Sequence, residues 1–147
     1  MSFADDVNAE LGQITSPIYD GAVSKGLKHG VGRCILPNGD AFKGTWKNGL
    51  RHGPGICRFA NGVIFKGEWR DDIPHGLGIL FTPSPNELIE ARFEDWKVVD
   101  GQVRILFTNG EFYDGIFEEG TRHTRGTHYY LNGDHYVGSW HRDQRVK

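Results

Sequence analysis

The chain has 147 residues, including 21 Gly, 6 Pro, 4 Trp, 5 Tyr and 9 Phe, and its 17 Lys and Arg against 19 Asp and Glu give a net charge of −2. This length suggests a single domain, and the abundance of aromatic side chains argues against intrinsic disorder. No stretch approaches the ~18 consecutive apolar residues of a membrane span, and residues 1–6 lack the basic start and apolar run of a signal peptide. We therefore expect a soluble, cytoplasmic protein, in which the two cysteines, Cys34 and Cys57, stay reduced.

Residues 1–18 form the first predicted element, an N-terminal capping arm. Phe3, Val7 and Leu11 recur with the i, i+4, i+8 spacing of one helix face, and Ser2 precedes Asp5 by three positions, a helix-start signal. We predict a short amphipathic helix or arm that lies on the first repeat or across the face of the sheet that follows.

Residues 19–147 are built from one repeating unit. Aromatic-x-Gly triplets start at Tyr19, Phe42, Phe65, Tyr113 and Tyr136, with starts 23 residues apart inside each group. The longer gap before Tyr113 leaves room for a degenerate fourth unit, so this domain holds about five and a half repeats. The clearest unit reads Phe42-x-Gly44-x-Trp46-x-x-Gly49-x-x-His52-Gly53-x-Gly55, followed by Asn61-Gly62.

The first arm of each unit has the pattern of a half-buried strand. Phe42, Gly44 and Trp46 share one face, whereas Lys43 and Thr45 share the other, and this period of two is typical of a strand with one face buried. The second arm is short and bounded by glycine, which is also typical of a strand.

The units follow one another through short turns. Asn-Gly pairs at 38–39, 61–62, 109–110 and 132–133 predict type I′ hairpin turns. Parallel crossovers would need a dozen or more linking residues, which the chain does not offer. We therefore predict an all-β fold, an elongated single-layer antiparallel meander of consecutive hairpins.

A glycine stands between the two aromatic residues of a unit, as Gly44 does between Phe42 and Trp46. Without a side chain at that place, a neighbouring ring can lie flat against the backbone. One hairpin alone is only marginally stable. We expect ring-on-glycine contacts between neighbouring units to hold the stack together, as in other linear repeat arrays.

Three histidines, His29, His52 and His75, recur at equivalent positions and raise the question of a metal site. Equivalent positions on successive hairpins lie roughly 10 Å apart, whereas the ligands of one zinc ion lie ~2.0–2.3 Å from it. We interpret these histidines as structural groups that hydrogen-bond the tight loops they occupy. The same spacing excludes a disulfide between Cys34 and Cys57.

The sequence contains no recognisable catalytic motif. The Gly-x-Gly pairs lack the third glycine and the Gly-Lys-Ser/Thr of phosphate-binding loops, and no serine lies in a nucleophile elbow. A single-layer sheet also lacks the deep pocket that catalysis usually requires. We expect no enzyme activity, no cofactor, no metal and no nucleic-acid partner.

Charge alternates along the chain, with −3 in residues 1–18, +5 in 19–64, −7 in 65–120 and +3 in 121–147. Such blocks can steer a charged partner or align two copies of the chain. They are equally compatible with solvated strand faces that prevent edge aggregation. As an alternative function, the basic repeats would bind the acidic phospholipids of a membrane surface. The candidate lipid-binding residues are Lys25, Lys28, Lys43, Lys47 and Arg51.

The repeat from residue 19 to 143 resembles the MORN (membrane occupation and recognition nexus) repeat, whose members include junctophilins, plant phosphatidylinositol phosphate kinases and small cytoskeletal or flagellar proteins of protists. The resemblance implies an elongated, twisted antiparallel sheet. The chain carries the repeats without a kinase or methyltransferase region, so those activities do not carry over. A scaffold role is implied, through a partner peptide, self-association or acidic phospholipid.

The leading hypothesis from the sequence is a non-catalytic protein-interaction scaffold whose aromatic-lined concave face takes a helix or extended segment of another protein. Aromatic side chains in a groove are typical anchors for helical ligands. The same rings have a competing structural role in holding the hairpins together. A homodimer and a cytoskeletal or flagellar association are further expectations. The candidate partner-binding residues are Phe42, Trp46, Phe65, Trp69, Tyr113, Phe117, Tyr136 and Trp140.

Overall fold

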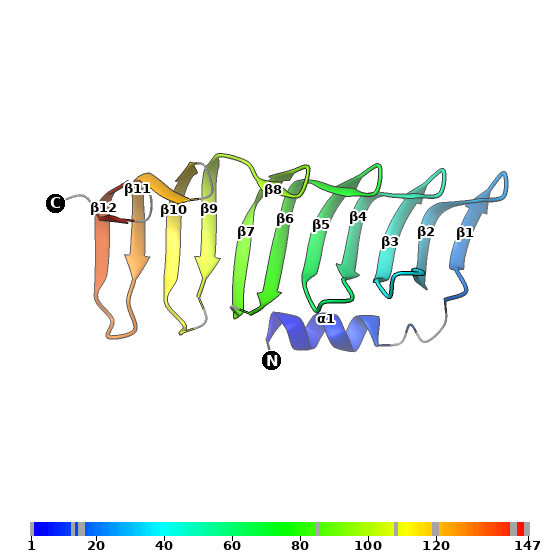
Figure 1. Ribbon diagram of the computed structural model, residues 1–147, viewed down its shortest axis with the longest axis horizontal. Coiled ribbons are helices and arrows are strands. Elements are labelled where there is room, and N and C mark those ends of the chain that lie inside the picture. The colour runs from blue at the N-terminus through cyan, green and yellow to red at the C-terminus, as the bar shows by residue number, and fades with distance from the viewer. Residues whose placement is uncertain are drawn as a thin grey trace.

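The computed structural model in Figure 1 describes residues 2–12, 14, 17–84, 86–107, 109–118, 121–141 and 144–145; at 121–125, 139–141, 144 and 145 it describes the backbone alone. One short helix precedes a single long sheet. The elements are α1 (Phe3–Leu11), β1 (Asp20–Ser24), β2 (Leu27–Ile35), β3 (Ala41–Lys47), β4 (Leu50–Arg58), β5 (Ile64–Arg70), β6 (Ile73–Pro83), β7 (Asn86–Glu94), β8 (Lys97–Val98), β9 (Gly101–Leu106), β10 (Phe112–Glu118), β11 (Thr121–Tyr129), β12 (His135–His141) and β13 (Gln144–Arg145).

Strands that follow one another in the chain lie side by side in the sheet. The order runs from β1 to β13, with β8 paired to β7 beside the main path, and each described pairing is antiparallel. Figure 1 shows β1 and β12 at opposite ends of the row and α1 running along the row near the ends of the middle strands, β3 to β6. The predicted all-β meander with a short N-terminal helix is confirmed.

The turns inside the hairpins are of type I′. Asn48 and Gly49, between β3 and β4, have φ of 51° and 86°, and a type I′ turn requires positive φ at both central residues. Three further hairpins whose turns lie in the described chain place two successive positive-φ residues at the same position, namely Lys25 with Gly26, Asp71 with Asp72 and Asp95 with Trp96.

The loops that join successive hairpins take a different form. In the loop from Leu36 to Asp40, the Gly39 N–H donates to the Leu36 carbonyl at 2.9 Å, and Gly39 alone of these five residues has a positive φ, 93°. This is a type I turn closed by a glycine bulge, so the prediction of a type I′ turn at these Asn-Gly pairs is wrong. The side-chain oxygen of Asn38 accepts the Asp40 N–H at 3.0 Å and fixes the loop.

Aromatic rings lie over pairs of glycines that face each other. Phe42 covers Gly44 and Gly55, which pair across β3 and β4, and a Cβ added to Gly55 would come 2.7 Å from ring atom Cε2. Both glycines belong to the same hairpin as the ring. The contacts therefore hold the two strands of one hairpin together, and the expectation that they link neighbouring hairpins is wrong. Tyr19, Phe65 and Tyr113 cover the glycines of their own hairpins in the same way.

Tryptophan provides the link between hairpins. The Trp46 indole N–H donates to the Gly32 carbonyl in the preceding hairpin at 3.1 Å, and Trp69 donates to Gly55 at 3.2 Å. Histidine adds a second link, since His29 Nδ1 accepts the backbone N–H of Asn48 at 3.4 Å. His52 Nδ1 likewise accepts the backbone N–H of Asp71 at 3.4 Å. The turns that His29 and His52 bind thus belong to the next hairpin, and for these two the expectation that they bind their own loops is wrong.

The hairpin of β7 and β9 stands in place of the degenerate fourth unit. Ile89, paired with Ile105, occupies the position of the ring, while Ala91 faces Gly78 and Val103 faces Gly115. A smaller side chain at the ring position leaves room for Cβ atoms where other units have glycine. Exchanges that conserve volume are the ones a core tolerates best.

Ten strands, β2 to β7 and β9 to β12, each contribute one residue to a row on the face of the sheet that carries the tryptophans. The members of this front row are cross-strand neighbours, and the front row consists of Cys34, Phe42, Cys57, Phe65, Leu80, Ile89, Ile105, Tyr113, His128 and Tyr136.

Burial makes the two thiols of the front row unreactive. Cys34 and Cys57 are free and buried, and burial raises the pKa of both, that of Cys57 to about 12. Because the thiolate is the reactive form, we expect neither thiol to react with a disulfide reagent at pH 8 in the folded protein and both to react in denaturant. Colorimetric thiol titration measures this, and rapid labelling of Cys57 without denaturant would contradict the described core.

Candidate functional site

The aromatic residues expected to line a binding groove form the core instead. Phe42, Phe65 and Tyr113 are at most 1 % exposed, and Trp46, Trp69 and Phe117 are also buried. Tyr136 is half-buried, and the side chain of Trp140 lies outside the described residues. Their neighbours are one another: Trp69 meets Phe42 and Phe65 edge to face, with ring centroids 5.4 and 5.5 Å apart. This arrangement matches the structural role of the rings and leaves no open aromatic groove among these six.

The basic residues of the alternative lipid site do not share one surface. Lys28 Nζ lies 5.4 Å from the centre of the Trp46 ring on the front face. Lys43 points to the opposite face, where its Nζ is 3.3 Å from Glu10 Oε1. Arg51 is buried against Trp69, whereas Lys25 and Lys47 are exposed. These cations therefore cannot all meet the same membrane.

Arg51 is held by Asp72 of the next hairpin. Its Nε donates to Asp72 Oδ1 at 2.7 Å and its backbone N–H donates to the same oxygen at 3.2 Å. Desolvation alone would raise the pKa of Asp72, but these hydrogen bonds outweigh it and hold the pKa below its ordinary value. Asp72 has a φ of 76°, at the position that Gly49 occupies in the preceding hairpin. The contacts of its carboxylate with Arg51 explain why aspartate is suitable there.

Replacing Asp72 with asparagine is expected to lower the free energy of unfolding by about 1 kcal/mol at pH 7. The substitution weakens a hydrogen bond to a charged group, and the loss is small because the carboxylate is partly exposed to solvent. A carboxylate whose pKa is lower in the folded than in the unfolded state stabilises above the unfolded pKa, and that contribution disappears as pH falls through the folded pKa. The deficit should therefore shrink below about pH 4. Denaturant titrations of D72N from pH 7 to 3 measure it, with the exposed neighbour D71N as control; a deficit independent of pH would contradict this assignment.

The face opposite the tryptophans carries a second line of cross-strand neighbours. We call it the back row; it runs perpendicular to the strands from β2 to β12. The back row consists of Ile35, Ala41, Arg58, Ile64, Phe81, Leu88, Leu106, Phe112, Tyr129 and His135.

The helix α1 covers the first half of the back row. Ser2 caps the helix, because its Oγ accepts the Asp5 N–H at 3.1 Å. Val7 and Leu11 are buried in one cluster with Ile56 and Ile64 of the sheet. At the start of the helix, Phe3 reaches Phe81 of β6, with ring centroids 6.5 Å apart. The predicted capping helix thus lies across several hairpins, from β6 back to β3.

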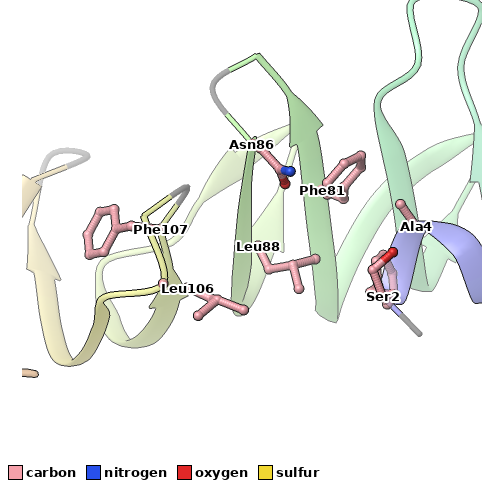
Figure 2. A pocket seen from close by; sticks show the side chains of 9 residues that line it. Ser2, Ala4, Phe81, Asn86, Leu88, Leu106 and Phe107 are labelled. Carbon is pink, nitrogen blue, oxygen red and sulfur yellow. The ribbon is translucent and has the colours of Figure 1, made fainter. Parts of the chain in front are cut away.

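The second half of the back row is open. Leu106 is 42 % and Tyr129 47 % exposed, while Leu88 and Phe112 are half-buried. A hollow of about 450 Å³ lies where α1 begins, and Figure 2 shows Phe81, Leu88 and Leu106 around it. Apolar side chains thus continue past the end of the helix with nothing over them in the described chain.

The sequence carries a signal for this face that the alternating strand pattern alone does not include. Strict alternation would place a polar residue beside each core position, but Leu106 follows Ile105 and Phe112 precedes Tyr113. Adjacent apolar residues in a strand indicate that both faces are to be covered. In β5 the same pattern, Ile64 beside Phe65, marks the seat of α1.

Among the described residues, no group of three or more His, Cys, Asp or Glu is arranged to hold a metal ion. In the same part of the chain, no helix has the length and apolar character needed to cross a bilayer. The candidate site is the open half of the back row, a partly exposed apolar surface on a linear stack of β-hairpins.

The fold and this surface define a class, the repeat proteins that stack hairpins into an open sheet. The MORN repeat model matches residues 19–41, 42–64, 65–84, 113–135 and 136–146, and the chain belongs to this family of non-enzymatic repeats. A comparison with curated proteins gives no match. Among solved structures, the TCP domain of SAS-4 (dCPAP) from Drosophila melanogaster, in complex with a proline-rich motif of Ana2 (dSTIL), is similar at 18 % identity and a TM-score of 0.34, over 84 % of this chain and 83 % of that one.

Proposed function

We propose that the protein is a non-catalytic interaction scaffold that binds another protein on the open half of the back row. One observation carries the proposal: the chain's own helix covers half of a mostly apolar row, and the other half lies partly exposed beside it. Contiguous apolar surface of this kind marks interaction sites. A cytoplasmic setting, associated with the cytoskeleton or a flagellum, belongs to the same proposal, and imaging of the tagged chain tests it.

Phospholipid binding is the weaker candidate because its cations are divided between the two faces. Lys43 is paired with Glu10, and Arg51 is buried and paired with Asp72. The electrostatic attraction of a membrane needs several cations near one surface. Repeats of this family suggest a scaffold for protein or membrane, and the geometry of this chain favours protein.

The proposal is tested with two leucine variants in affinity purification from the native cell. Leu106 lies in the open half and is 42 % exposed; Leu27, at the start of β2, is 47 % exposed and is a matched control. We expect proteins that co-purify with the wild type and with L27S to be lost with L106S. If L106S retains every protein that the wild type retains, the back row is not the binding surface.

A further inference from the structure

We propose that the open half of the back row binds a basic amphipathic helix of a partner protein, lying in line with α1. This inference rests on the proposed function and names the chemistry of the partner. Two properties of the face lead to it, its continuity with the seat of α1 and its charge.

Continuity decides the shape of the partner segment. The seat of α1 and the open half are the same row of cross-strand neighbours, with Phe81 joining them. From Ala41 to Phe81 the row crosses β3 to β6, and from Leu88 to Tyr129 it crosses β7, β9, β10 and β11, an equal number of strands. At ~4.8 Å between strands each stretch is roughly 14 Å long, which corresponds to about nine helical residues. The helix α1 has 9 residues, so a second helix of this length fits the open half.

The charges around α1 show how this face selects a helix. Asp5, Asp6 and Glu10 make α1 acidic, and it has no basic residue. Beneath it, Lys43 pairs with Glu10 at 3.3 Å, and Arg58 donates to Asn8 Oδ1 at 3.0 Å. The row next to the back row adds two more cations on this half of the face, Lys66 and Arg33, the latter paired with Asp20 of β1 at 3.4 Å. An acidic helix thus lies on a basic half of the sheet.

In the open half the charge is reversed. In the row next to the back row, the positions in this half are occupied by Glu90, Arg104 and Asp114. Arg104 is already engaged, with its Nε 3.7 Å from Asp114 Oδ2, while Glu90 is exposed at the edge of a hollow with Leu88 and Leu106. Residues 86–118, which include β7 to β10, carry a net charge of −5. Complementary charge sets orientation and partner choice, so the apolar stripe of the partner helix should be flanked by Lys or Arg.

The test uses the full chain and two labelled 14-residue peptides with leucine at i, i+4 and i+8, one with lysine and one with glutamate at the remaining exposed positions. We expect fluorescence anisotropy to show the lysine peptide binding at least ~10-fold more tightly, an advantage that falls as salt rises. L106S should weaken its binding ~10-fold, whereas L27S should not. The double variant E90K/D114K should abolish the preference for lysine.

A control double variant changes the net charge of the chain by the same amount as E90K/D114K but at positions outside the open half. Asp71 and Asp95 occupy turn positions equivalent to Lys25, which shows that lysine is accepted at this φ. The double variant D71K/D95K should therefore leave the preference for the lysine peptide intact. The inference would be overturned if neither peptide binds, if both bind equally, or if the glutamate peptide binds better. It would also be overturned if D71K/D95K removes the preference for lysine as fully as E90K/D114K does.

These failures are distinguishable from failure of the proposed function. If native partners depend on Leu106 but the glutamate peptide binds better, the scaffold proposal stands and the basic helix is wrong. If light scattering shows that the chain forms a dimer and L106S dissociates it, the occupant is a second copy and the basic helix is equally wrong.

Discussion

Replacing Trp69 with alanine is expected to lower the free energy of unfolding by about 3–5 kcal/mol, the range for large-to-small changes in a core. The side chain is 2 % exposed, and its indole N–H is bound to the Gly55 carbonyl of the neighbouring hairpin. The variant removes this link, the edge-to-face contacts with Phe42 and Phe65, and the surface on which the Arg51 guanidinium lies 4.5 Å from the ring centre. Denaturant unfolding followed by circular dichroism measures the loss.

The matched control is Trp96, a tryptophan on the same face. It is 50 % exposed, and its φ of 68° is strained for a bulky residue. Glycine, which the first two hairpins place at this position as Gly26 and Gly49, removes the strain. We expect W96G to change the free energy of unfolding by less than about 1 kcal/mol. Equal losses in W69A and W96G would contradict the role of tryptophan as the link between hairpins.

The second large effect is expected at the glycine pair under Phe42. A Cβ at Gly55 would overlap the ring, and overpacking of a core costs about 1–3 kcal/mol. We expect G55A to be destabilised by at least this much. The φ of Gly55 is not positive, so the backbone itself accepts alanine and the cost arises from the ring.

A double-mutant cycle isolates that cause. The hairpin of β7 and β9 already combines a smaller residue, Ile89, with Ala91 and Val103 at the glycine positions. The variant F42L/G55A should therefore be more stable than the sum of its single variants predicts, by about 1 kcal/mol or more. Additive losses would show that the ring and the glycine act independently.

The repeats could be predicted because each hairpin carries its own pattern. Phe42, Gly44 and Trp46 fix one strand face by alternation, and one glycine signal, at Asn48-Gly49, marks a type I′ turn. The Asn-Gly pairs between hairpins are indistinguishable from it as dipeptides. They fold differently because the Asn38 side chain binds the backbone two residues further on.

The site was harder to predict because aromatic residues serve either a core or a surface. The sequence could not show that Phe42 and Trp69 shield one another, since this depends on how closely adjacent hairpins approach. Each glycine pair lets the ring of its own hairpin lie on the backbone, and the tryptophan of the next hairpin packs against that ring, as Trp69 does against Phe42. The binding surface that we propose therefore lies on the other face, where Leu106 and Phe112 interrupt the alternation.

The central claim, that the back face and not the aromatic front meets the partner, can be tested by photo-crosslinking in the native cell. Phe112 lies in the open half of the back row, whereas Trp96 packs on the front against Phe59, with ring centroids 5.2 Å apart. With p-benzoylphenylalanine placed at either position of the full chain, we predict a crosslinked partner from position 112 and none from position 96. A partner captured from position 96 but not from 112 would contradict the account.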